Sequence, residues 1–402
     1  MKYVVVLIDG AADDRIEELD NKTPLMSADM PTIRELEKRA DIGYVKTVPD
    51  GMTPGSDIAN LSVMGYDPKI YHTGRSPLEA LSVGVKMKED DIAIRMNLVT
   101  LSDDEDFNDK RMIDYSGGEI STEESKELVE ALIEGFKNEK DYSIYHGVSY
   151  RHVFIWHEGS LEINLIPPHN ITGEKIFKHL PEGINSEFFI DFIKKGYEIL
   201  KDHPVNLKRI SEGKKPANSP WLWGEGKKPL LDKFEDLYGL KGGVISAVDL
   251  IRGIGKGAGM EVINVPGATG TIHTNFKGKG EAAVSALNNG LDYMYIHLEA
   301  PDECGHQGDI SGKVRALELI DEHIVKKLVR ELKDDFRMLV VPDHRTPLKT
   351  RKHDSVPVPY MIYDSRQDLG TGLIYNEEDA LKGRYIDAGI KLHALLIEKM
   401  AQ

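Results

Sequence analysis

The apolar residues of this chain fall into two recurring patterns, short continuous runs and helically spaced stretches. Residues 3–9, YVVVLID, form a β-branched run that ends in an acid. Continuous runs of this length are typical of strands buried on both faces of a parallel sheet. Further runs of the same kind occur at 242–248, 260–265, 293–298 and 337–343.

Helical patterns lie between these runs. In residues 30–40 the apolar positions recur at helical spacing, and Pro31 stands near the start, where proline favours a first helical turn. Residues 56–65 also predict a helix, with Gly65 where it would stop. Three more helices are expected at 280–290, 311–333 and 386–400. This alternation predicts an α/β domain with a mostly parallel central sheet flanked by helices.

Residues 75–215 follow a different pattern. The stretch 92–109 predicts a strand followed by an acidic loop, and 121–139 predicts a capped amphipathic helix. The stretch 142–159 predicts paired neighbouring strands. Strands and helices in this arrangement predict a small α+β domain.

The boundaries of that domain follow from composition. Residues 211–229 are rich in Pro, Gly and Lys, which predicts a linker or a rim. We therefore expect a discontinuous first domain, made of residues 1–74 and 220–402. The inserted domain would comprise residues 75–219.

Composition restricts the class of protein. The chain has 402 residues, of which 40% are hydrophobic and 29% charged, as in soluble globular proteins with two domains. The net charge of −16 argues against general nucleic-acid binding, which needs a basic surface. An anionic substrate would need a local positive centre, supplied by Arg and Lys or by metal ions.

Other features bear on the compartment. Cys304 is the single cysteine, so no intrachain disulfide can form and a cytoplasmic location is expected. The N-terminal sequence has no signal-peptide pattern, and no apolar run reaches the roughly 18 residues of a membrane span. We expect no membrane partner. The oligomeric state stays open.

Three predicted strands deliver acids at their carboxyl ends, where an open parallel sheet binds its ligands. Two of these acids have histidine close by, and one more histidine follows in the sequence RKHDSVP. The group comprises Asp9, Asp302, His306, Asp343, His344 and His353. Mixed carboxylate and imidazole ligands suit transition metals, and six of them suit two ions that share a phosphate. The alternative is that each acid merely caps the helix after its strand.

Ser56 begins a predicted helix in the sequence TPGSDIANLSVMG. A hydroxyl at this place lies among free N–H groups at the positive end of the helix, as a phosphoryl site requires. A metal ion could activate it as a nucleophile. The alternative is an ordinary serine N-cap.

Several long motifs resemble those of the alkaline phosphatase superfamily: Asp9 after the first strand, TPGSDIANLSVMGYDP, GRSPLEA, DECGHQGD and PDHRTP with a later histidine. Within it, the chain closely resembles the archaeal-type, cofactor-independent phosphoglycerate mutases. RMNLVT, PPHNITG and ANSPWLWGEG are also similar to that subfamily, so the resemblance runs nearly end to end.

The resemblance implies that Ser56 is the nucleophile and becomes a phosphoserine. It implies two divalent metal ions, with Mn²⁺ expected and Zn²⁺, Mg²⁺ or Co²⁺ as alternatives, and no 2,3-bisphosphoglycerate cofactor. One ion would be held by Asp9, Asp343, His344 and Ser56 Oγ. The other would be held by Asp302, His306 and His353.

The implied activity is that of an isomerase, the interconversion of 2- and 3-phosphoglycerate in glycolysis and gluconeogenesis. The inserted domain would close over the substrate and keep water out. Asn170 departs from the subfamily, where an aspartate is expected. The candidates for holding the substrate carboxylate are Arg75, Arg95, Arg151, His152, His169 and Lys241.

Three alternatives remain. A homoserine kinase-like phosphotransferase would use ATP, although no Walker-type phosphate loop is visible. A metal-dependent phosphomonoesterase would release inorganic phosphate. A non-catalytic metal-binding protein would not need Ser56.

Overall fold

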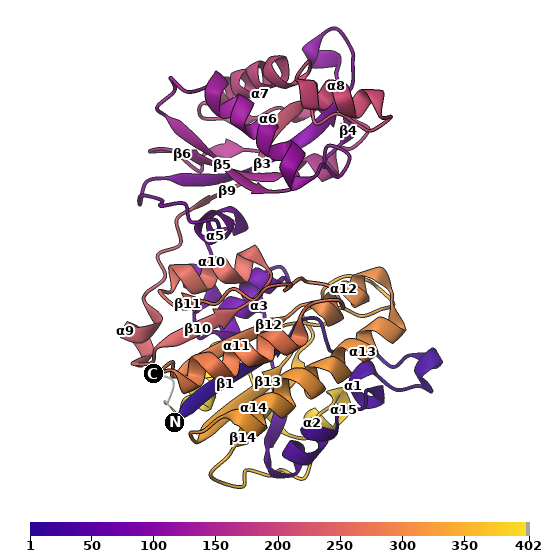
Figure 1. The fold of residues 1–402 in the computed structure, drawn as a ribbon, viewed down its shortest axis with the longest axis vertical. Coiled ribbons are helices and arrows are strands. Elements are labelled where there is room, and N and C mark those ends of the chain that lie inside the picture. Colours follow the sequence, from indigo (N-terminus) through magenta and orange to yellow (C-terminus); the bar gives the residue numbers. More distant parts are fainter. Residues whose placement is uncertain (399–402) are drawn as a thin grey trace. The chain divides into compact units, whose positions relative to one another are not determined.

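The computed structural model describes residues 1–398, which form two compact units (Figure 1). The first unit comprises Met1–His72 and the chain from Leu230 onward, and the second comprises Thr73–Pro229. The second unit includes residues 220–229 because Ser219–Lys227 forms strand β9, which pairs with β3 (Ile92–Leu101). The expectation of a linker at 211–229 is therefore wrong for this stretch. Although this stretch is rich in Pro and Gly, it also contains buried side chains, such as Trp221.

A mixed sheet forms the centre of the first unit. Within the described residues it has eight strands in the order β11-β10-β12-β1-β13-β14-β2-β15. Only β14 runs antiparallel to its neighbours, so the predicted mostly parallel sheet is confirmed. The strands are β1 (Lys2–Ile8), β2 (Asp41–Val45), β10 (Gly242–Ile245), β11 (Glu261–Val262), β12 (Tyr293–Leu298), β13 (Phe336–Val341), β14 (Val358–Asp364) and β15 (Arg384–Ile386).

Helices cover both faces of this sheet (Figure 1). On one face, Val4, Val6 and Ile8 of β1 pack into a buried cluster with α11 (Phe276–Asn288) and α13 (Ile310–Ile320). The helices α3 (Ser56–Val63), α10 (Asp249–Gly257) and α16 (Gly389–Leu396) contact one another through α3. The last two residues of the helix expected at 386–400 lie outside the described residues.

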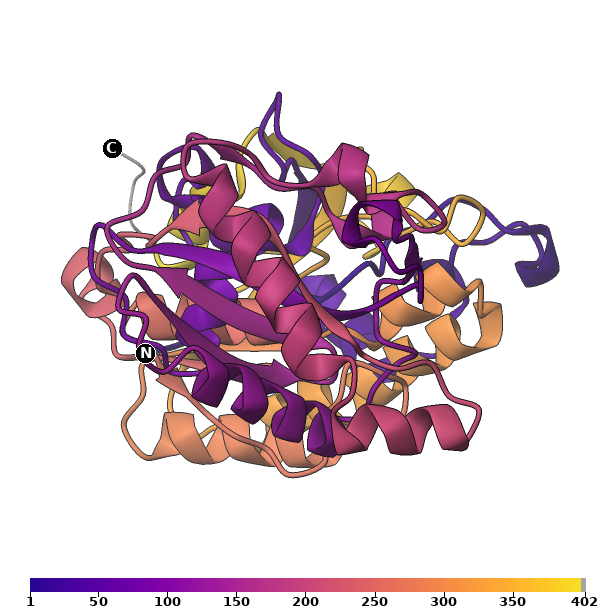
Figure 2. The same ribbon diagram turned by 90° about the horizontal axis from the view of Figure 1, so that it is seen from above.

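The second unit has an antiparallel sheet. Its strands are β3, β4 (Met112–Asp114), β5 (Tyr142–Val148), β6 (Arg151–Trp156) and β9. The helices α6 (Thr122–Gly135), α7 (Ser186–Leu200) and α8 (Pro204–Ser211) belong to the same unit. Figure 2 shows α6 and α7, in magenta tones, running over the sheet, and their apolar residues join those of β3 and β6 in one cluster.

A short helix covers part of the other sheet face. Helix α5 (Arg75–Ser82) contacts β3 and β9, and Ala80 forms a small apolar cluster with Val153 and Ile155 of β6. Successive residues of β6 therefore point to opposite faces, as strand geometry requires. Among the residues described, no helix is long and apolar enough to cross a membrane.

Candidate metal centre

The three strands at the middle of the large sheet carry the predicted ligands at their carboxyl ends. β1 lies between β12 and β13 and is parallel to both. Asp9 follows β1, while Asp343 and His344 follow β13. Helix α12 (Ala300–Gln307) begins directly after β12 and carries Asp302 and His306 one turn apart. The parallel arrangement therefore collects residues from both ends of the chain at one sheet edge.

One group of side chains surrounds His344. Its Nε2 lies 3.2 Å from Ser56 Oγ, 3.4 Å from Asp343 Oδ2 and 3.6 Å from Asp9 Oδ1. The ligand atoms of Asp9, Asp343 and His344 all lie within 4.8 Å of one another. This spacing suits one bound cation.

A second group surrounds Asp302. Its carboxylate oxygens lie 3.2 Å from His306 Nε2 and 3.4 Å from His353 Nε2. The two imidazole nitrogens are themselves 2.9 Å apart. The ring of His353 stacks on the ring of His344 with centroids 3.9 Å apart, so the two groups are contiguous. His344 can also be grouped with Asp302 and His353 within 4.8 Å, and the division of the ligands between two cations stays a prediction.

The histidine tautomers favour metal binding. The Nδ1–H of His306 donates to the carbonyl oxygen of Arg351 at 3.0 Å, which directs Nε2 towards Asp302. Nδ1 of His344 lies 3.4 Å from Thr346 Oγ1, whose own hydroxyl donates to Asp302. A hydrogen bond at Nδ1 leaves the Nε2 lone pair of a neutral imidazole available to a metal ion.

The site contains buried carboxylates, which a cation would stabilise. Asp9, Asp302 and Asp343 are all buried, and in the described part of the chain their ion-pair partners are histidines alone. Burial, reinforced by the charge of Asp343, raises the pKa of Asp9 well above its usual range. Asp9 Oδ1 is buried and has no hydrogen-bond partner among the residues that the structure describes. Buried carboxylates that lack partners are costly, so these residues fit a bound cation.

In the second group, the contacts favour a protonated histidine. Burial alone would raise the pKa of Asp302, but hydrogen bonds with His306 and His353 lower it below its usual value. The hydrogen bond with Asp302 raises the pKa of His306 to about 9. A cation at this place would therefore have to displace a proton.

Ser56 differs from the expectation of an N-cap. Gly55 takes the capping position, and Ser56 is the first residue of α3, with no side-chain capping bond at this helix start. Its Oγ instead approaches His344 Nε2. The hydroxyl is thus beside the acidic group and at the positive end of a helix, where phosphate is favoured.

Gly10 allows the loops of the site to pack closely. Its φ of +61° is in the left-handed region, which favours glycine. A Cβ at this position would lie 2.5 Å from Asp302 Oδ1 and 2.7 Å from Thr346 Oγ1. Its N–H donates to Asp343 Oδ1 at 3.2 Å. The loop after β1 therefore touches both groups of ligands.

Sequence reasoning missed several residues that support the ligands. Asn60 Nδ2 donates to Asp343 Oδ2 at 2.9 Å and to the carbonyl of Ser56 at 2.8 Å. Tyr295 donates to Asn60 Oδ1 at 2.7 Å. His297 Nε2 lies 3.0 Å from Asp9 Oδ2. The available signal was the alternation in YMYIHL, where Tyr295 and His297 interrupt an apolar strand on one face.

Some candidates for substrate binding share one face of the second unit. Arg95 and Arg151 lie on neighbouring strands, where Arg95 pairs in register with Val153. Arg95 donates to Glu79 at 2.8 Å and lies 4.6 Å from the ring centroid of Trp223. The exposed His169 contacts Trp223 edge-on.

The other three candidates lie elsewhere. His152 is adjacent to Arg151 in sequence, but it is buried and points to the opposite sheet face, which helices cover. Lys241 precedes β10, so it lies at the sheet edge opposite the carboxyl ends that carry the ligands. Arg75 is exposed at the start of α5.

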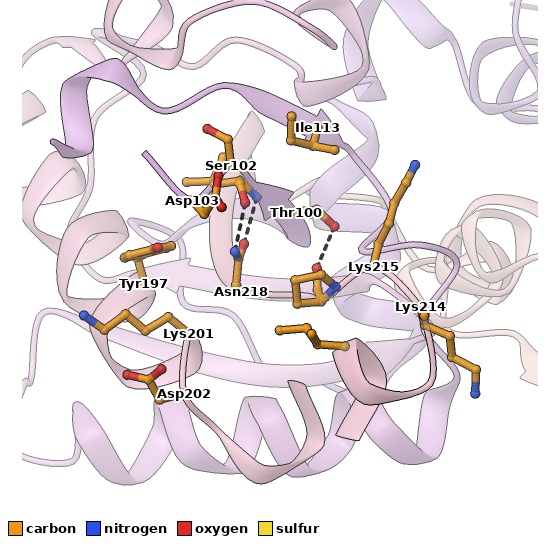
Figure 3. Close-up of a pocket in the computed structure, with 14 residues that line it drawn as sticks. Thr100, Ser102, Asp103, Ile113, Tyr197, Lys201, Asp202, Lys214, Lys215 and Asn218 are labelled. Carbon is orange, nitrogen blue, oxygen red and sulfur yellow. Dashed lines mark hydrogen bonds between the residues drawn. The ribbon is translucent and has the colours of Figure 1, made fainter. Parts of the chain in front are cut away.

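A cavity of about 570 Å³ in the second unit contains none of these candidates (Figure 3). Its wall includes Tyr197, Asn218 and the lysines at positions 201, 214 and 215. Lys214 and Lys215 pair with Glu212 and Asp114. The charge of this rim is therefore largely neutralised.

The buried position of His152 has a consequence for stability. Burial lowers the pKa of His152 from 6.5 to about 3. Between these pH values the unfolded chain binds a proton on this histidine and the folded chain does not. The contribution of His152 to the free energy of unfolding is therefore constant above pH 6.5. It falls by about 1.4 kcal/mol per pH unit as the pH decreases towards 3. His152→Asn should remove that slope, because asparagine does not bind a proton in this pH range. Its amide oxygen can still accept the hydrogen bond from the N–H of Gly147.

Urea titrations followed by tryptophan fluorescence measure this effect. All three tryptophans, Trp156, Trp221 and Trp223, belong to the second unit, so the signal reports its unfolding. Equal pH slopes in the original chain and the variant would contradict the burial of His152.

Comparisons with known proteins complete the description of the site. The profile of the family described as 2,3-bisphosphoglycerate-independent phosphoglycerate mutase matches residues 38–206. A Geobacter sulfurreducens protein named probable 2,3-bisphosphoglycerate-independent phosphoglycerate mutase is 44% identical and covers 99% of this chain and 100% of its own. A Methanosarcina barkeri protein named 2,3-bisphosphoglycerate-independent phosphoglycerate mutase is 46% identical, covering 95% and 96%.

Solved structures are similar as well. The PH0037 protein from Pyrococcus horikoshii has a TM-score of 0.83 and 27% identity, covering 100% of this chain and 98% of its own. The cofactor-independent phosphoglycerate mutase from Thermoplasma acidophilum has a TM-score of 0.69 at 24% identity, covering 99% of each chain. The second likeness concerns the fold alone.

Proposed function

The chain belongs to the family of 2,3-bisphosphoglycerate-independent phosphoglycerate mutases, and from this premise we propose that it interconverts 2- and 3-phosphoglycerate through a phosphoryl group carried by Ser56. It is accordingly an isomerase of glycolysis and gluconeogenesis that uses no 2,3-bisphosphoglycerate. A cytoplasmic location is part of the proposal.

The position of Ser56 is the observation that supports this most directly. Its hydroxyl is free of capping and lies 3.2 Å from His344 Nε2, beside buried carboxylates. A helix start beside it supplies N–H groups for phosphate oxygens. A nucleophile, an anion site and a cation site thus coincide at one sheet edge.

We further propose that two divalent cations bind here, with Mn²⁺ as the expected ion. Asp9, Asp343, His344 and Ser56 Oγ would hold one, and Asp302, His306 and His353 would hold the other. Bound cations would supply Lewis acidity, neutralise phosphate charge and lower the pKa of the serine hydroxyl.

The protein residues carry the transfer itself. Ser56 Oγ attacks phosphorus in line, so a serine O–P bond forms as the ester O–P bond of the substrate breaks. Glycerate keeps the ester oxygen, which takes up the proton released by Ser56. Glycerate then reorients, and its other hydroxyl attacks the phosphoserine, breaks the serine O–P bond and gives up its proton to Ser56 Oγ. Atoms balance without water or a second phosphate donor. Excluding water is what separates this reaction from phosphate hydrolysis.

The substrate carboxylate needs cationic partners during this exchange. Arg75, Arg95, Arg151 and His169 remain the proposed ones, since guanidinium groups bind carboxylates bidentately. Glu79 holds the guanidinium of Arg95 in place. His152 is omitted because it is buried on the sheet face that helices cover. Lys241 is omitted because it lies at the sheet edge opposite the candidate ligands.

A direct assay tests the reaction. The chain is treated with chelator, reloaded with Mn²⁺, and incubated with 3-phosphoglycerate without ATP or 2,3-bisphosphoglycerate, and product is detected with enolase. We expect 2-phosphoglycerate to form, and Mn²⁺ omission to abolish it. A strict requirement for ATP would indicate a kinase-like enzyme instead. Inorganic phosphate appearing faster than 2-phosphoglycerate would indicate a phosphomonoesterase.

A further inference from the structure

The central strand β12 carries buried polar side chains on one face. Tyr295 and His297 are two residues apart and are 0% and 1% exposed. Met294, Ile296 and Leu298 alternate with them and belong to the apolar core on the other face. A buried imidazole in a central strand is costly unless its two nitrogens have partners.

Both nitrogens of His297 have partners. Ser246, just after β10, places Oγ 3.3 Å from His297 Nδ1. That Oγ accepts a hydrogen bond from the N–H of Val248 at 2.9 Å, so its own hydrogen is available to Nδ1. The carbonyl oxygen of Val248 is a more distant acceptor, at 3.5 Å. Nδ1 therefore accepts, and the hydrogen of the neutral ring is on Nε2.

The Nε2–H of His297 donates to Asp9 Oδ2 at 3.0 Å. The other oxygen, Oδ1, is buried, has no hydrogen-bond partner in residues 1–398, and lies 3.6 Å from His344 Nε2. The protein thus donates a hydrogen bond to Oδ2 of Asp9, and Oδ1 is available to a cation. A carboxylate that binds a metal through one oxygen and accepts a hydrogen bond on the other has this arrangement.

Asp343, the neighbouring carboxylate, is supported differently. Its Oδ1 accepts from the N–H groups of Gly10 and His344, and its Oδ2 accepts from Asn60. Backbone donors therefore fix Asp343, whereas within the described residues His297 is the one N–H donor to the carboxylate of Asp9. The orientation of Asp9 depends on a single side chain.

We propose that His297 is a positioning residue, which holds Asp9 so that Oδ1 alone is presented to the cation shared with Asp343 and His344. It does not touch substrate, and Ser246 sets its tautomer. The inference rests on the proposed cation site. Its effect is on cation affinity first and on turnover through that affinity.

The test compares Mn²⁺ binding to full-length variants by calorimetry and by the electron paramagnetic resonance signal of free Mn²⁺. His297→Leu keeps the volume and removes the donor, and we expect it to weaken one of two binding events about 10- to 100-fold. His297→Gln should restore much of the affinity, because its amide can donate near the Nε2 position. Ser246→Ala should weaken binding several-fold.

A second buried histidine of the same unit provides the control. His393 is 1% exposed and packs among Phe234, Tyr238 and Tyr293. His393→Leu should leave Mn²⁺ affinity unchanged, whatever it does to the melting temperature. The rise in melting temperature on adding Mn²⁺ should shrink for His297→Leu but not for His393→Leu.

The outcomes separate this inference from the proposed function. Wild-type affinity in folded His297→Leu, or in Ser246→Ala should the leucine variant fail to fold, would overturn the positioning role. Equal loss in the leucine and glutamine variants would also overturn it, since the donor would then be irrelevant. An original chain that binds no divalent cation would instead contradict the proposed cation site.

Discussion

Ser56→Ala is expected to lower phosphoglycerate interconversion by about 10⁴- to 10⁶-fold, the range found when a covalent nucleophile is removed. The hydroxyl is the atom that would accept the phosphoryl group, and the cation site offers no substitute for the covalent bond. Folding should be unaffected, because Ser56 makes no capping bond at the start of α3. The enolase-coupled assay measures the loss.

The same helix offers a matched control. Ser62 lies in α3 and is buried, and a Cβ at Gly389, the first residue of α16, would lie 2.5 Å from its Oγ. Ser62→Ala should retain activity within a few fold. Acid-quenched samples given 3-phosphoglycerate should contain phosphate on Ser56, detected by mass spectrometry, in the original chain and in Ser62→Ala. Activity retained by Ser56→Ala would leave the covalent route without support.

Asp302→Asn should have the next largest effect. Asp302 forms ion pairs with both His306 and His353, and an amide is a much weaker ligand than a carboxylate. We expect the bound Mn²⁺ to fall from two ions per chain to one, and the turnover to fall about 10³-fold, since a catalytic ion contributes several kcal/mol. Equilibrium dialysis with metal analysis gives the stoichiometry.

A nearby acid separates this effect from general loss of charge. Asp309 caps α13 by accepting from the N–H of Gly312, and asparagine caps helices equally well. Asp309→Asn should therefore keep two ions and normal turnover. Two ions retained by Asp302→Asn would mean that this carboxylate is no ligand.

The sequence predicted the sheet, and it predicted that the candidate ligands would lie together at one edge, because both follow from short-range patterns. The run 3–9 and its acid identify a buried strand and the residue at its end, and parallel strands necessarily bring such ends together. The supporting residues were harder to find. His297 lies inside an apolar run, and its importance depends on a partner, Asp9, that is adjacent only after folding.

The errors have physical causes too. Residues 211–229 were expected to form a linker or a rim from their Pro, Gly and Lys content, yet Ser219–Lys227 pairs with β3, with one irregularity in register. Trp221 and Leu222 in that stretch are buried, which outweighs the local preference of the backbone. His152 was grouped with Arg151 by adjacency, although neighbours in a strand point to opposite faces.

The pairing of β1 determines when this protein can finish folding on the ribosome. Tyr3 is in register with Tyr293 and Lys2 with Phe336. Strand β1 therefore cannot pair until β12 and β13, in the last third of the chain, have been translated. At roughly 5–20 residues per second, that interval lasts tens of seconds. Thr73–Pro229 emerges whole during the delay, while the apolar β1 remains a natural target for chaperones on the nascent polypeptide.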